Sequence, residues 1–217
     1  MKAELFRHGA GENLLIFFNG WGMDLSRAAS WELPGTDLLV LSEYTESDRI
    51  PEAPGRYSRC GVLAWSFGVW RAAALLSEQT GLPQGPRVAV NGTLEPLSAE
   101  TGIDPVIFEK TLRNWLLPET REKFLLRMTG ARFPISRRTP ESQQEELAFL
   151  GRAVRETGRV KNPFRQVFCG RRDRIFPFEA QKRFWGRCPE VTVREGDFRH
   201  DPFCEAGSLR EILDSCL

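Results

Sequence analysis

The stretch LAWSFGVW, residues 63–70, joins two kinds of local pattern around one serine. The apolar run GVLAW before Ser66 predicts a strand, and the run FGVWRAAALL after it predicts a helix. A serine in a tight turn between a strand and a helix is typical of a nucleophile elbow, whose strained backbone admits only small residues two positions before and after it. Ala64 and Gly68 occupy those positions. The same pattern also occurs as plain turn geometry, so the role of Ser66 depends on the rest of the chain.

Further apolar runs are typical of strands and alternate with helical stretches. Together with the run before Ser66, the predicted strands are LLIFFNG (14–20), DLLVLSE (37–43), CGVLAW (60–65), RVAVNG (87–92), RQVFCG (165–170) and EVTVRE (190–195). Helices are predicted to begin after Asp24, after Ser66, near Pro177 and near Ala206. Most of the runs are too uniformly apolar for a half-exposed antiparallel sheet. We therefore expect an α/β fold, with a mostly parallel central sheet flanked by helices.

One region interrupts this alternation of strands and helices. Residues 93–162 contain no convincing strand. They contain three helix-like stretches, near 105–116, 119–129 and 141–158. In an open α/β sheet, an insertion after a strand lies over the carboxyl ends of the strands, where ligands bind. We expect one compact domain, with a core formed by residues 1–92 and 163–217 and a helical lid insertion formed by residues 93–162.

The chain supplies partners for a serine nucleophile. A serine hydroxyl is a poor nucleophile near neutral pH and needs a base, together with a group that orients the base. His200, in the loop GDFRHDPF, follows the last predicted strand, and Asp173, in FCGRRDRIFP, follows the strand before it. The chain order Ser66, Asp173, His200 is that of the catalytic triad in α/β-hydrolases. Each residue alone could be a helix cap or a loop residue, but three such residues that each follow a strand favour a triad.

Other residues compete for the roles of base and acid. His8, the other of the two histidines, lies at the end of the first edge segment and is expected at the surface. Asp197 and Asp201 are rival acids. Both are so close to His200 in sequence that their carboxylates can hardly contact the ring nitrogen that faces away from Ser66. Asp173 is therefore preferred as the orienting acid.

The tetrahedral intermediate of ester hydrolysis carries an oxyanion, which backbone N–H groups stabilise. One donor is expected to be the N–H of Phe67, the residue after the nucleophile. The other is expected from the loop NGWGMD, where Gly20 and Gly22 let the backbone turn and leave the Trp21 N–H pointing inward. The Trp21 side chain can equally be a core aromatic. Asn19 stands where many hydrolases carry histidine and is expected to support the loop.

Composition excludes several classes of function. The chain has 217 residues, 41% of them hydrophobic, and a formal net charge of +1 from 30 basic and 29 acidic residues. Such a balance gives no field that would favour nucleic acid or an anionic membrane. The longest apolar run, LLIFF, is too short to cross a bilayer, and no hydrophobic signal segment appears near the first residue, so we expect a cytoplasmic protein.

The cysteines do not form a recognisable framework. The chain has five, an odd number, widely spaced and without a C-x-x-C motif. This pattern disfavours both a disulfide-bonded scaffold and a zinc site, so reduced thiols are expected.

Several motifs together resemble one protein family. They are FFNGWGMD (17–24), LAWSFGVW (63–70), VAVNGT (88–93) with GID shortly after it, FCGRRDRIFP (168–177) and RHDPF (199–203). In this combination the chain resembles the BioG-type pimeloyl-acyl-carrier-protein methyl ester esterases of bacterial biotin synthesis. The blocks NGWGMD, AWSFGVW and VNGT are more specific to that family than the general elbow pattern.

The resemblance implies an α/β-hydrolase fold and a serine esterase activity. Ser66 is then the nucleophile, Asp173 and His200 complete the triad, and Trp21 and Phe67 are the oxyanion donors. The implied reaction hydrolyses the methyl ester of pimeloyl-acyl-carrier protein to pimeloyl-acyl-carrier protein and methanol. It needs no metal and no organic cofactor. Its implied partner is the acyl carrier protein, and the esterase itself is expected to be a monomer.

The predicted insertion carries a local excess of positive charge. Between residues 121 and 165 there are eleven lysines and arginines against five glutamates. Carrier proteins are acidic, so this excess suits their docking. The spacing of Arg152, Arg155 and Arg159 predicts one shared helical face, which we expect to meet the carrier. The alternative is an ordinary solvated surface.

Two other functions stay open at this point. A general carboxylesterase or thioesterase would use the same triad without needing the basic insertion. A noncatalytic hydrolase-like binding module would keep the fold without needing all three triad residues, and their joint presence argues against it.

Overall fold

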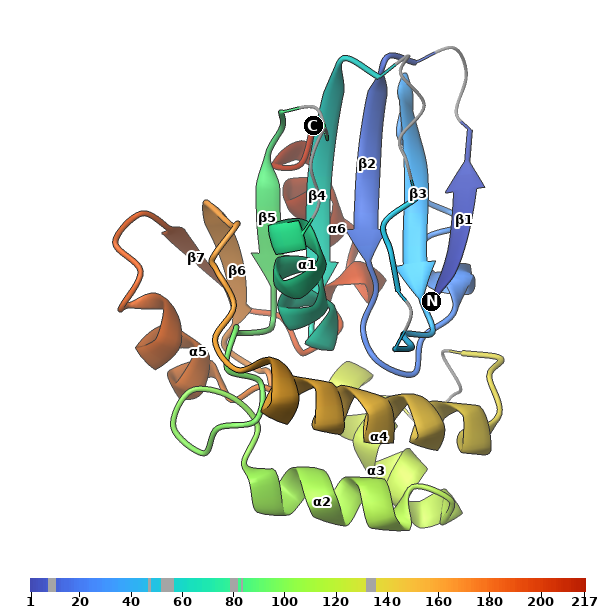
Figure 1. The fold of residues 1–217 in the computed structure, drawn as a ribbon, viewed down its shortest axis with the longest axis vertical. Helices are drawn as coiled ribbons and strands as arrows, with labels where there is room; N and C mark the ends of the chain where they lie inside the picture. Colours follow the sequence, from blue (N-terminus) through green and yellow to red (C-terminus); the bar gives the residue numbers. More distant parts are fainter. Residues whose placement is uncertain (8–10, 47, 52–56, 79–81, 83, 132–135) are drawn as a thin grey trace.

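The computed structural model describes residues 1–7, 11–46, 48–51, 57–78, 82, 84–131 and 136–217. Within them, one sheet has the strand order β1-β3-β2-β4-β5-β6-β7 (Figure 1). The strands are β1 (Lys2–Phe6), β2 (Asn13–Phe18), β3 (Thr36–Ser42), β4 (Arg59–Trp65), β5 (Arg87–Val90), β6 (Gln166–Gly170) and β7 (Thr192–Gly196). β1 pairs antiparallel with β3, and the other neighbouring strands are parallel. The predicted mostly parallel sheet is confirmed.

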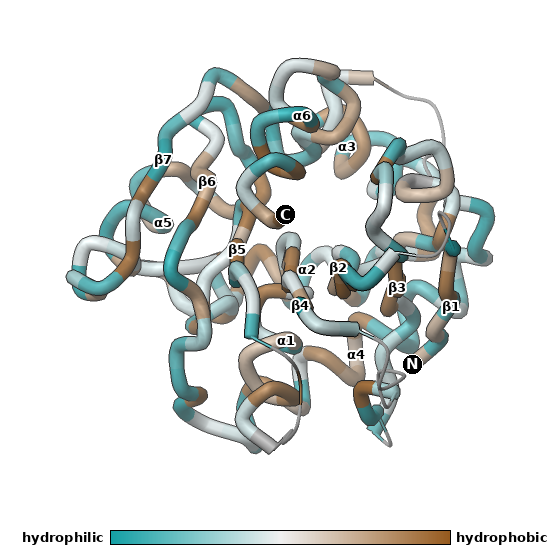
Figure 2. The backbone as a smooth tube through the Cα atoms, turned by 90° about the horizontal axis from the view of Figure 1, so that it is seen from above, coloured by the Kyte–Doolittle hydropathy of each residue, from teal (hydrophilic) through white to brown (hydrophobic). Residues whose placement is uncertain are grey.

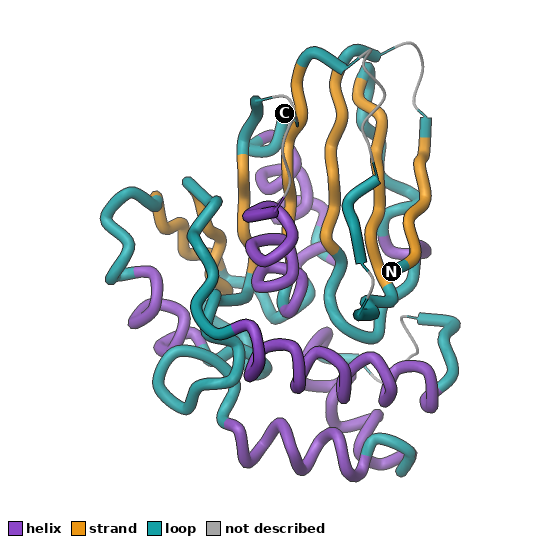
Figure 3. The backbone as a smooth tube through the Cα atoms, in the orientation of Figure 1, coloured by secondary structure: helices purple, strands orange, loops and turns teal. Residues whose placement is uncertain are grey.

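Helices lie on both faces of the sheet and beyond the carboxyl ends of its strands. The helices are α1 (Phe67–Glu78), α2 (Pro105–Asn114), α3 (Pro118–Thr129), α4 (Pro140–Thr157), α5 (Phe178–Trp185) and α6 (Ala206–Asp214). Viewed along the strands, α1 and α6 lie on opposite faces of the sheet (Figure 2). The helices α2, α3 and α4 lie together beyond the carboxyl ends of the central strands, which the arrowheads in Figure 1 mark; Figure 3 shows the same view coloured by secondary structure.

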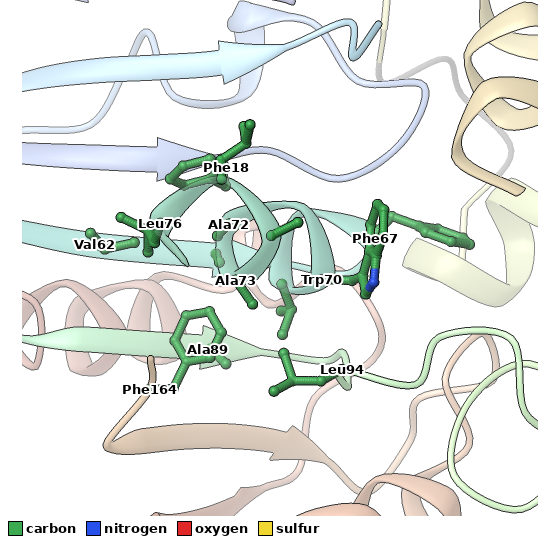
Figure 4. Close-up of a cluster of buried hydrophobic side chains, with 14 of the residues drawn as sticks. Phe18, Val62, Phe67, Trp70, Ala72, Ala73, Leu76, Ala89, Leu94 and Phe164 are labelled. Carbon is green, nitrogen blue, oxygen red and sulfur yellow. The ribbon is translucent and has the colours of Figure 1, made fainter. Parts of the chain in front are cut away.

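The alternation of side chains along the central strands builds two cores. In β2, Leu14, Ile16 and Phe18 belong to the core under α1, whereas Leu15 and Phe17 belong to the core on the opposite face. Figure 4 shows the first of these, with α1 seated on β2, β4 and β5. Because both faces are buried, β2 is apolar at nearly every position, which explains why its sequence lacks the alternation of a half-exposed strand.

The predictions for individual elements have mixed outcomes. The six predicted strands are present, with small shifts at their ends, and β1 is an additional edge strand. The helix predicted after Asp24 is wrong: only the short 3₁₀ turn η1 (Leu25–Arg27) follows it. Beyond this turn the chain runs to β3 with Trp31 and Leu33 buried in the core, and Pro34 disfavours helical backbone at Leu33. Trp31 lies against Phe17, with ring centroids 4.8 Å apart.

The three helix-like stretches of the predicted insertion are confirmed as α2, α3 and α4. Each begins with a proline in its first turn, where the missing N–H costs no intrahelical hydrogen bond. Helix α3 ends at Gly130, whose φ of 83° lies in the left-handed region that favours glycine. Whether these helices act as a lid stays a prediction.

Candidate active site

Ser66 occupies the turn between β4 and α1, as the elbow pattern predicts. Its φ is 59°, a left-handed conformation that is uncommon for a residue with a side chain. Its N–H donates to the carbonyl of Val90 at the end of β5, with N and O 3.0 Å apart. A Cβ at Gly68 would lie 2.4 Å from the Phe18 carbonyl oxygen, so glycine is required where α1 approaches the end of β2.

The structure brings the three predicted triad residues together. His200 Nε2 lies 2.9 Å from Ser66 Oγ, and His200 Nδ1 lies 2.8 Å from Asp173 Oδ2. All three residues are at most 5% exposed. Nucleophile, base and orienting carboxylate thus form one chain of hydrogen bonds, the arrangement that lets a histidine take the proton of a serine.

Asp173 is held by the turn that follows β6. Its Oδ1 accepts hydrogen bonds from the backbone N–H groups of Ile175 and Phe176, at 2.8 and 3.0 Å. Its Oδ2 accepts a further bond from Gln181 Nε2 on α5, at 3.1 Å. The Phe176 ring lies parallel to the His200 ring, with 7° between the planes. These contacts leave the carboxylate one orientation, with Oδ2 toward the imidazole.

Asn91, which the sequence reasoning did not select, holds the backbone of His200. Its Nδ2 donates to the carbonyl oxygens of Arg199 and His200, at 2.8 and 2.9 Å. Its Oδ1 accepts from the Gly170 N–H at the end of β6, at 2.8 Å. The indole of Trp65 donates to the same His200 carbonyl. The available signal was an asparagine directly after a strand, a residue type that tolerates the left-handed φ of 47° found here.

The rival residues lie elsewhere. Asp197 is at the surface, where its Oδ1 is 3.0 Å from Arg172 Nε. Asp201 is buried, and its Oδ1 accepts from the N–H of Phe203 in the 3₁₀ turn η2 (Pro202–Cys204). His8 lies outside the described residues.

The loop after β2 passes beside Ser66. Asn19 supports it, because Asn19 Nδ2 donates to the Asp24 carbonyl at 2.8 Å and Oδ1 accepts from the Gly20 N–H at 2.9 Å. Trp21 and Phe67 both line the pocket that contains Ser66. Phe67 is the first residue of α1, where a helix leaves its N–H without an intrahelical partner. The roles of Trp21 and Phe67 as oxyanion donors stay predictions.

The pocket around Ser66 is walled mainly by aromatic and aliphatic side chains. It encloses about 580 Å³ of empty space, a volume that includes its open mouth. The helices α2, α3 and α4 contribute a large share of its wall. The lining residues are Gly20, Trp21, Trp65, Ser66, Phe67, Ile103, Ile107, Phe108, Thr111, Phe124, Arg127, Met128, Leu147, Arg174, Ile175 and His200. Arg127 on α3 and Arg174 after β6 are exposed, and we call them the pocket arginines.

The prediction that Arg152, Arg155 and Arg159 share one helical face is wrong. Helix α4 ends at Thr157, and the positive φ of Gly158 turns the chain away before Arg159. The other two arginines are exposed and form ion pairs, Arg152 with Glu46 and Arg155 with Glu109. All three lie at or beyond the last turns of α4, and we call them the helix-end arginines.

Three negative observations apply to the part of the chain that the structure describes. It contains no group of three or more His, Cys, Asp or Glu side chains that could hold a metal ion. Its helices are all too short or too polar to cross a membrane. The five cysteines, which all fall within the described residues, form no disulfide bond.

The strand order, the place of Ser66 after β4 and the order of the triad in the chain define an α/β-hydrolase fold. Solved structures agree: an esterase from Exiguobacterium antarcticum aligns with a TM-score of 0.71 at 13% identity, covering 98% of this chain and 93% of that one. Within this class, the chain belongs to the BioG family. The family model described as pimeloyl-ACP methyl esterase BioG matches residues 1–208.

Two relatives place the chain more closely. The crystal structure of BioG from Haemophilus influenzae aligns with a TM-score of 0.82 at 29% identity, covering 94% of this chain and 95% of that one. A Bacteroides fragilis protein named malonyl-[acyl-carrier protein] O-methyltransferase is 35% identical over 190 residues. Those residues are 84% of this chain but 38% of that protein, so this chain spans well under half the length of the relative.

Proposed function

We propose that the chain is a serine esterase that hydrolyses the methyl ester of pimeloyl-acyl-carrier protein to pimeloyl-acyl-carrier protein and methanol in biotin synthesis. The observation that carries the proposal is the hydrogen-bonded Ser66, His200 and Asp173 in the pocket of a BioG family member. The family supplies the substrate class, and the geometry supplies the chemistry.

The proposed reaction has two halves. Ser66 Oγ attacks the ester carbonyl carbon while His200 Nε2 takes the hydroxyl proton, and the oxyanion is bound by the N–H groups of Trp21 and Phe67. The C–O bond to the methoxy group then breaks, and His200 gives its proton to the leaving methoxide. Water repeats the sequence on the acyl-enzyme, with His200 again as base, and releases the carboxylic acid and Ser66. Asp173 keeps the imidazole in the required tautomer throughout.

The name of the Bacteroides fragilis relative supports a methyl ester on a carrier protein as the substrate. That protein is named for methyl transfer to malonyl-acyl-carrier protein, and it is more than twice as long as the segment that matches this chain. A methyl ester on an acyl-carrier protein is the product of methyl transfer to the free carboxylate of a carrier-bound acyl chain. The hydrogen-bonded Ser66, His200 and Asp173 of this chain support hydrolysis rather than methyl transfer, so we assign it the removal of the methyl group.

The thioester that joins the acyl chain to the carrier is at least as reactive as the methyl ester and must be spared by position. The pocket is walled by Trp21, Phe108 and Phe124, and Ser66 within it is only 5% exposed. We propose that only the far end of an extended acyl chain reaches Ser66, because the bulk of the carrier stops at the mouth.

We propose that the carrier docks over the pocket arginines. Arg127 and Arg174 line the pocket itself, so an acidic partner held there would have its acyl chain directed at Ser66. The helix-end arginines are partly neutralised by Glu46 and Glu109 and line no part of this pocket. We assign them a longer-range attraction that raises the rate of encounter.

A kinetic comparison tests the proposal against its two alternatives. The proposal expects kcat/KM for methyl pimeloyl-carrier protein to exceed that for a free methyl ester, and Ser66→Ala to abolish turnover of both. Equal kcat/KM for both substrates, or release of the acyl chain from its thioester, would favour a general carboxylesterase or thioesterase. Absence of turnover, together with failure of a fluorophosphonate to label Ser66, would favour a noncatalytic module.

A further inference from the structure

The loop that follows β2 is attached to α4 by the side chains of two residues one turn apart. Trp21 Nε1 donates to the backbone carbonyl of Gln143 at 2.7 Å, and Gln143 Nε2 donates to the Gly22 carbonyl at 2.8 Å. The Gly22 N–H donates to Glu146 Oε2 at 3.0 Å. Both backbone polar groups of Gly22 are thus bonded to side chains from a segment more than a hundred positions away in the chain.

Glu146 is the centre of this attachment. Its residue is 4% exposed, and its carboxylate receives donors from three separate segments. Oε1 accepts from the N–H of Tyr44, just after β3, at 2.9 Å. Oε2 accepts from Gly22 and pairs with the guanidinium of Arg138, which lies just before α4. One carboxylate therefore joins the loops after β2 and β3 to the inserted helices.

The geometry of the loop shows what this attachment controls. The Gly20 carbonyl accepts the N–H of Met23, with N and O 3.4 Å apart. Because a trans peptide is planar, the Trp21 N–H points in the direction opposite to that carbonyl. Gly22 follows with a φ of 75°, and its two hydrogen bonds to α4 fix the peptides on both of its sides. The Trp21 N–H belongs to the preceding peptide, which is joined to these two by the turn that the Gly20 carbonyl and the Met23 N–H close, so its direction depends on α4 through that turn.

Leu147 and Leu150 also attach α4 to the core by apolar packing. A buried carboxylate costs desolvation energy, which raises the pKa of the Glu146 carboxyl, while Arg138 and the backbone donors oppose that rise. Arg138 also balances the negative charge of this carboxylate, which bonds to Gly22, the residue after the expected oxyanion donor. The ion pair therefore provides directed acceptors for the loop without leaving a net charge beside the site.

We infer that Glu146 and Gln143 are positioning residues for the oxyanion site. These two side chains of α4 affect the rate of ester hydrolysis by holding the loop that carries Trp21, and they do not contact the substrate. The inference rests on the proposed function, in which the Trp21 N–H stabilises the oxyanion. A displaced donor weakens binding of the transition state more than binding of the ester, so the loss should fall on kcat rather than on KM.

The test compares two variants with a matched control on the same helix. Glu146→Gln keeps the shape but lacks the second acceptor oxygen. Gln143→Met removes the donor to Gly22, together with the acceptor of the Trp115 indole N–H. Both should lower kcat for a p-nitrophenyl ester by about 10- to 100-fold, somewhat less than the loss of a whole oxyanion donor. Their KM should change by no more than about twofold. Gln144→Ala removes only a bond to the Leu112 carbonyl on α2 and should leave kcat unchanged.

A trifluoromethyl ketone separates positioning from simple stability. It adds to Ser66 as a hemiketal whose oxyanion occupies the donor site, so its inhibition constant should rise in both variants by the same factor as kcat falls. Equal inhibition constants in folded variants and parent would overturn the inference, as would an equal loss in Gln144→Ala. Failure of both variants to fold, while Gln144→Ala folds, would assign the two side chains to stability and also overturn it.

The same measurements distinguish failure of this inference from failure of the proposed function. If the parent is not inhibited by the ketone, or if Ser66→Ala still hydrolyses the ester, the serine mechanism itself is wrong. If inhibition of the parent depends on Ser66 and the variants match the parent, only the positioning roles of Glu146 and Gln143 are wrong.

Discussion

Asp173 receives three hydrogen bonds besides its contact with the His200 ring. Asp173→Asn should therefore keep the fold, because the amide oxygen can still accept the two backbone bonds. The amide nitrogen would face the imidazole as a donor and favour the wrong tautomer. We expect kcat to fall by up to about 10⁴-fold, measured with a p-nitrophenyl ester on protein whose circular dichroism is unchanged.

Asp197→Asn is the matched control for this prediction. Its carboxylate lies at the surface against Arg172, and exposed pairs of this kind contribute little. Activity should stay within about twofold of the parent. A large loss in Asp197→Asn, with Asp173→Asn active, would show that the acid has been assigned to the wrong residue.

The buried thiols provide a second prediction at the residue scale. Burial raises the pKa of the Cys60 thiol to about 11 and that of Cys169 to about 12. The thiolate is the reactive form, so near neutral pH these cysteines should resist iodoacetamide, whereas the exposed Cys204 should react. Esterase activity should survive the treatment. Alkylation of each cysteine is measured by peptide mass spectrometry. Loss of activity in proportion to alkylation of Cys169 would implicate a thiol in the mechanism.

Single residues were predictable where chemistry limits the choice. Ser66, Asp173 and His200 could be found because each follows a strand and few residue types can do their work. Glu146 gave no such signal, because its partners are two backbone N–H groups and an arginine that sequence spacing does not bring together.

At the scale of elements, the junction of β4 and α1 depends on Gly68. A Cβ there would lie 2.4 Å from the Phe18 carbonyl oxygen and 2.5 Å from that of Asn19, both backbone atoms. We expect Gly68→Ala to destabilise the protein by about 1–3 kcal/mol or more, measured by urea unfolding. In Gly207→Ala, at the start of α6, the added methyl meets open space. That substitution should stabilise by about 0.5–1 kcal/mol.

The opposite ranking of the two alanine variants would contradict the close approach of α1 to β2. Equal stability of Gly68→Ala and the parent would show that the elbow can relax at no cost. The Gly68→Ala variant should also lose esterase activity under conditions in which it is still folded, because the added methyl displaces the turn that carries Ser66.

Elements were predictable where a local pattern decided them, and not where distant contacts did. The β2 and β4 runs are short and apolar at nearly every position, which favours buried strands over helices. Asp24 begins a helical turn by accepting a hydrogen bond from the Ser26 N–H. It also accepts one from the N–H of Arg137, which lies between α3 and α4 and is more than a hundred residues away in the chain. No local signal shows that the turn stops there. Likewise, the spacing of three arginines predicted a common face, and Gly158 ended the helix before the third.

At the scale of the whole molecule, the net charge is close to neutral, while the segment 121–165 carries eleven basic and five acidic residues. Changing all three helix-end arginines to glutamate should lower kcat/KM for the carrier-linked ester, and added salt should narrow the difference from the parent. A p-nitrophenyl ester needs no carrier and should be hydrolysed as before. A matched triple reversal uses Arg59, Arg194 and Arg210, which are exposed and line no part of the pocket.

Reversal of the pocket arginines should reduce kcat/KM for the carrier-linked ester more than reversal of the helix-end arginines. If the matched triple reversal has the same effect as the helix-end reversal, only the overall charge matters. If none of the three sets matters, the basic segment 121–165 is a solvated surface and docking has been assigned to the wrong place.

The most direct test of the central claim is the intact mass of methyl pimeloyl-carrier protein after incubation with the enzyme. The account predicts that the carrier loses the mass of one methylene, the difference between a methyl ester and an acid, while its thioester survives. Ser66→Ala should leave the mass unchanged. Release of the whole acyl chain, or conversion that continues in Ser66→Ala, would contradict the claim that Ser66 removes the terminal methyl group.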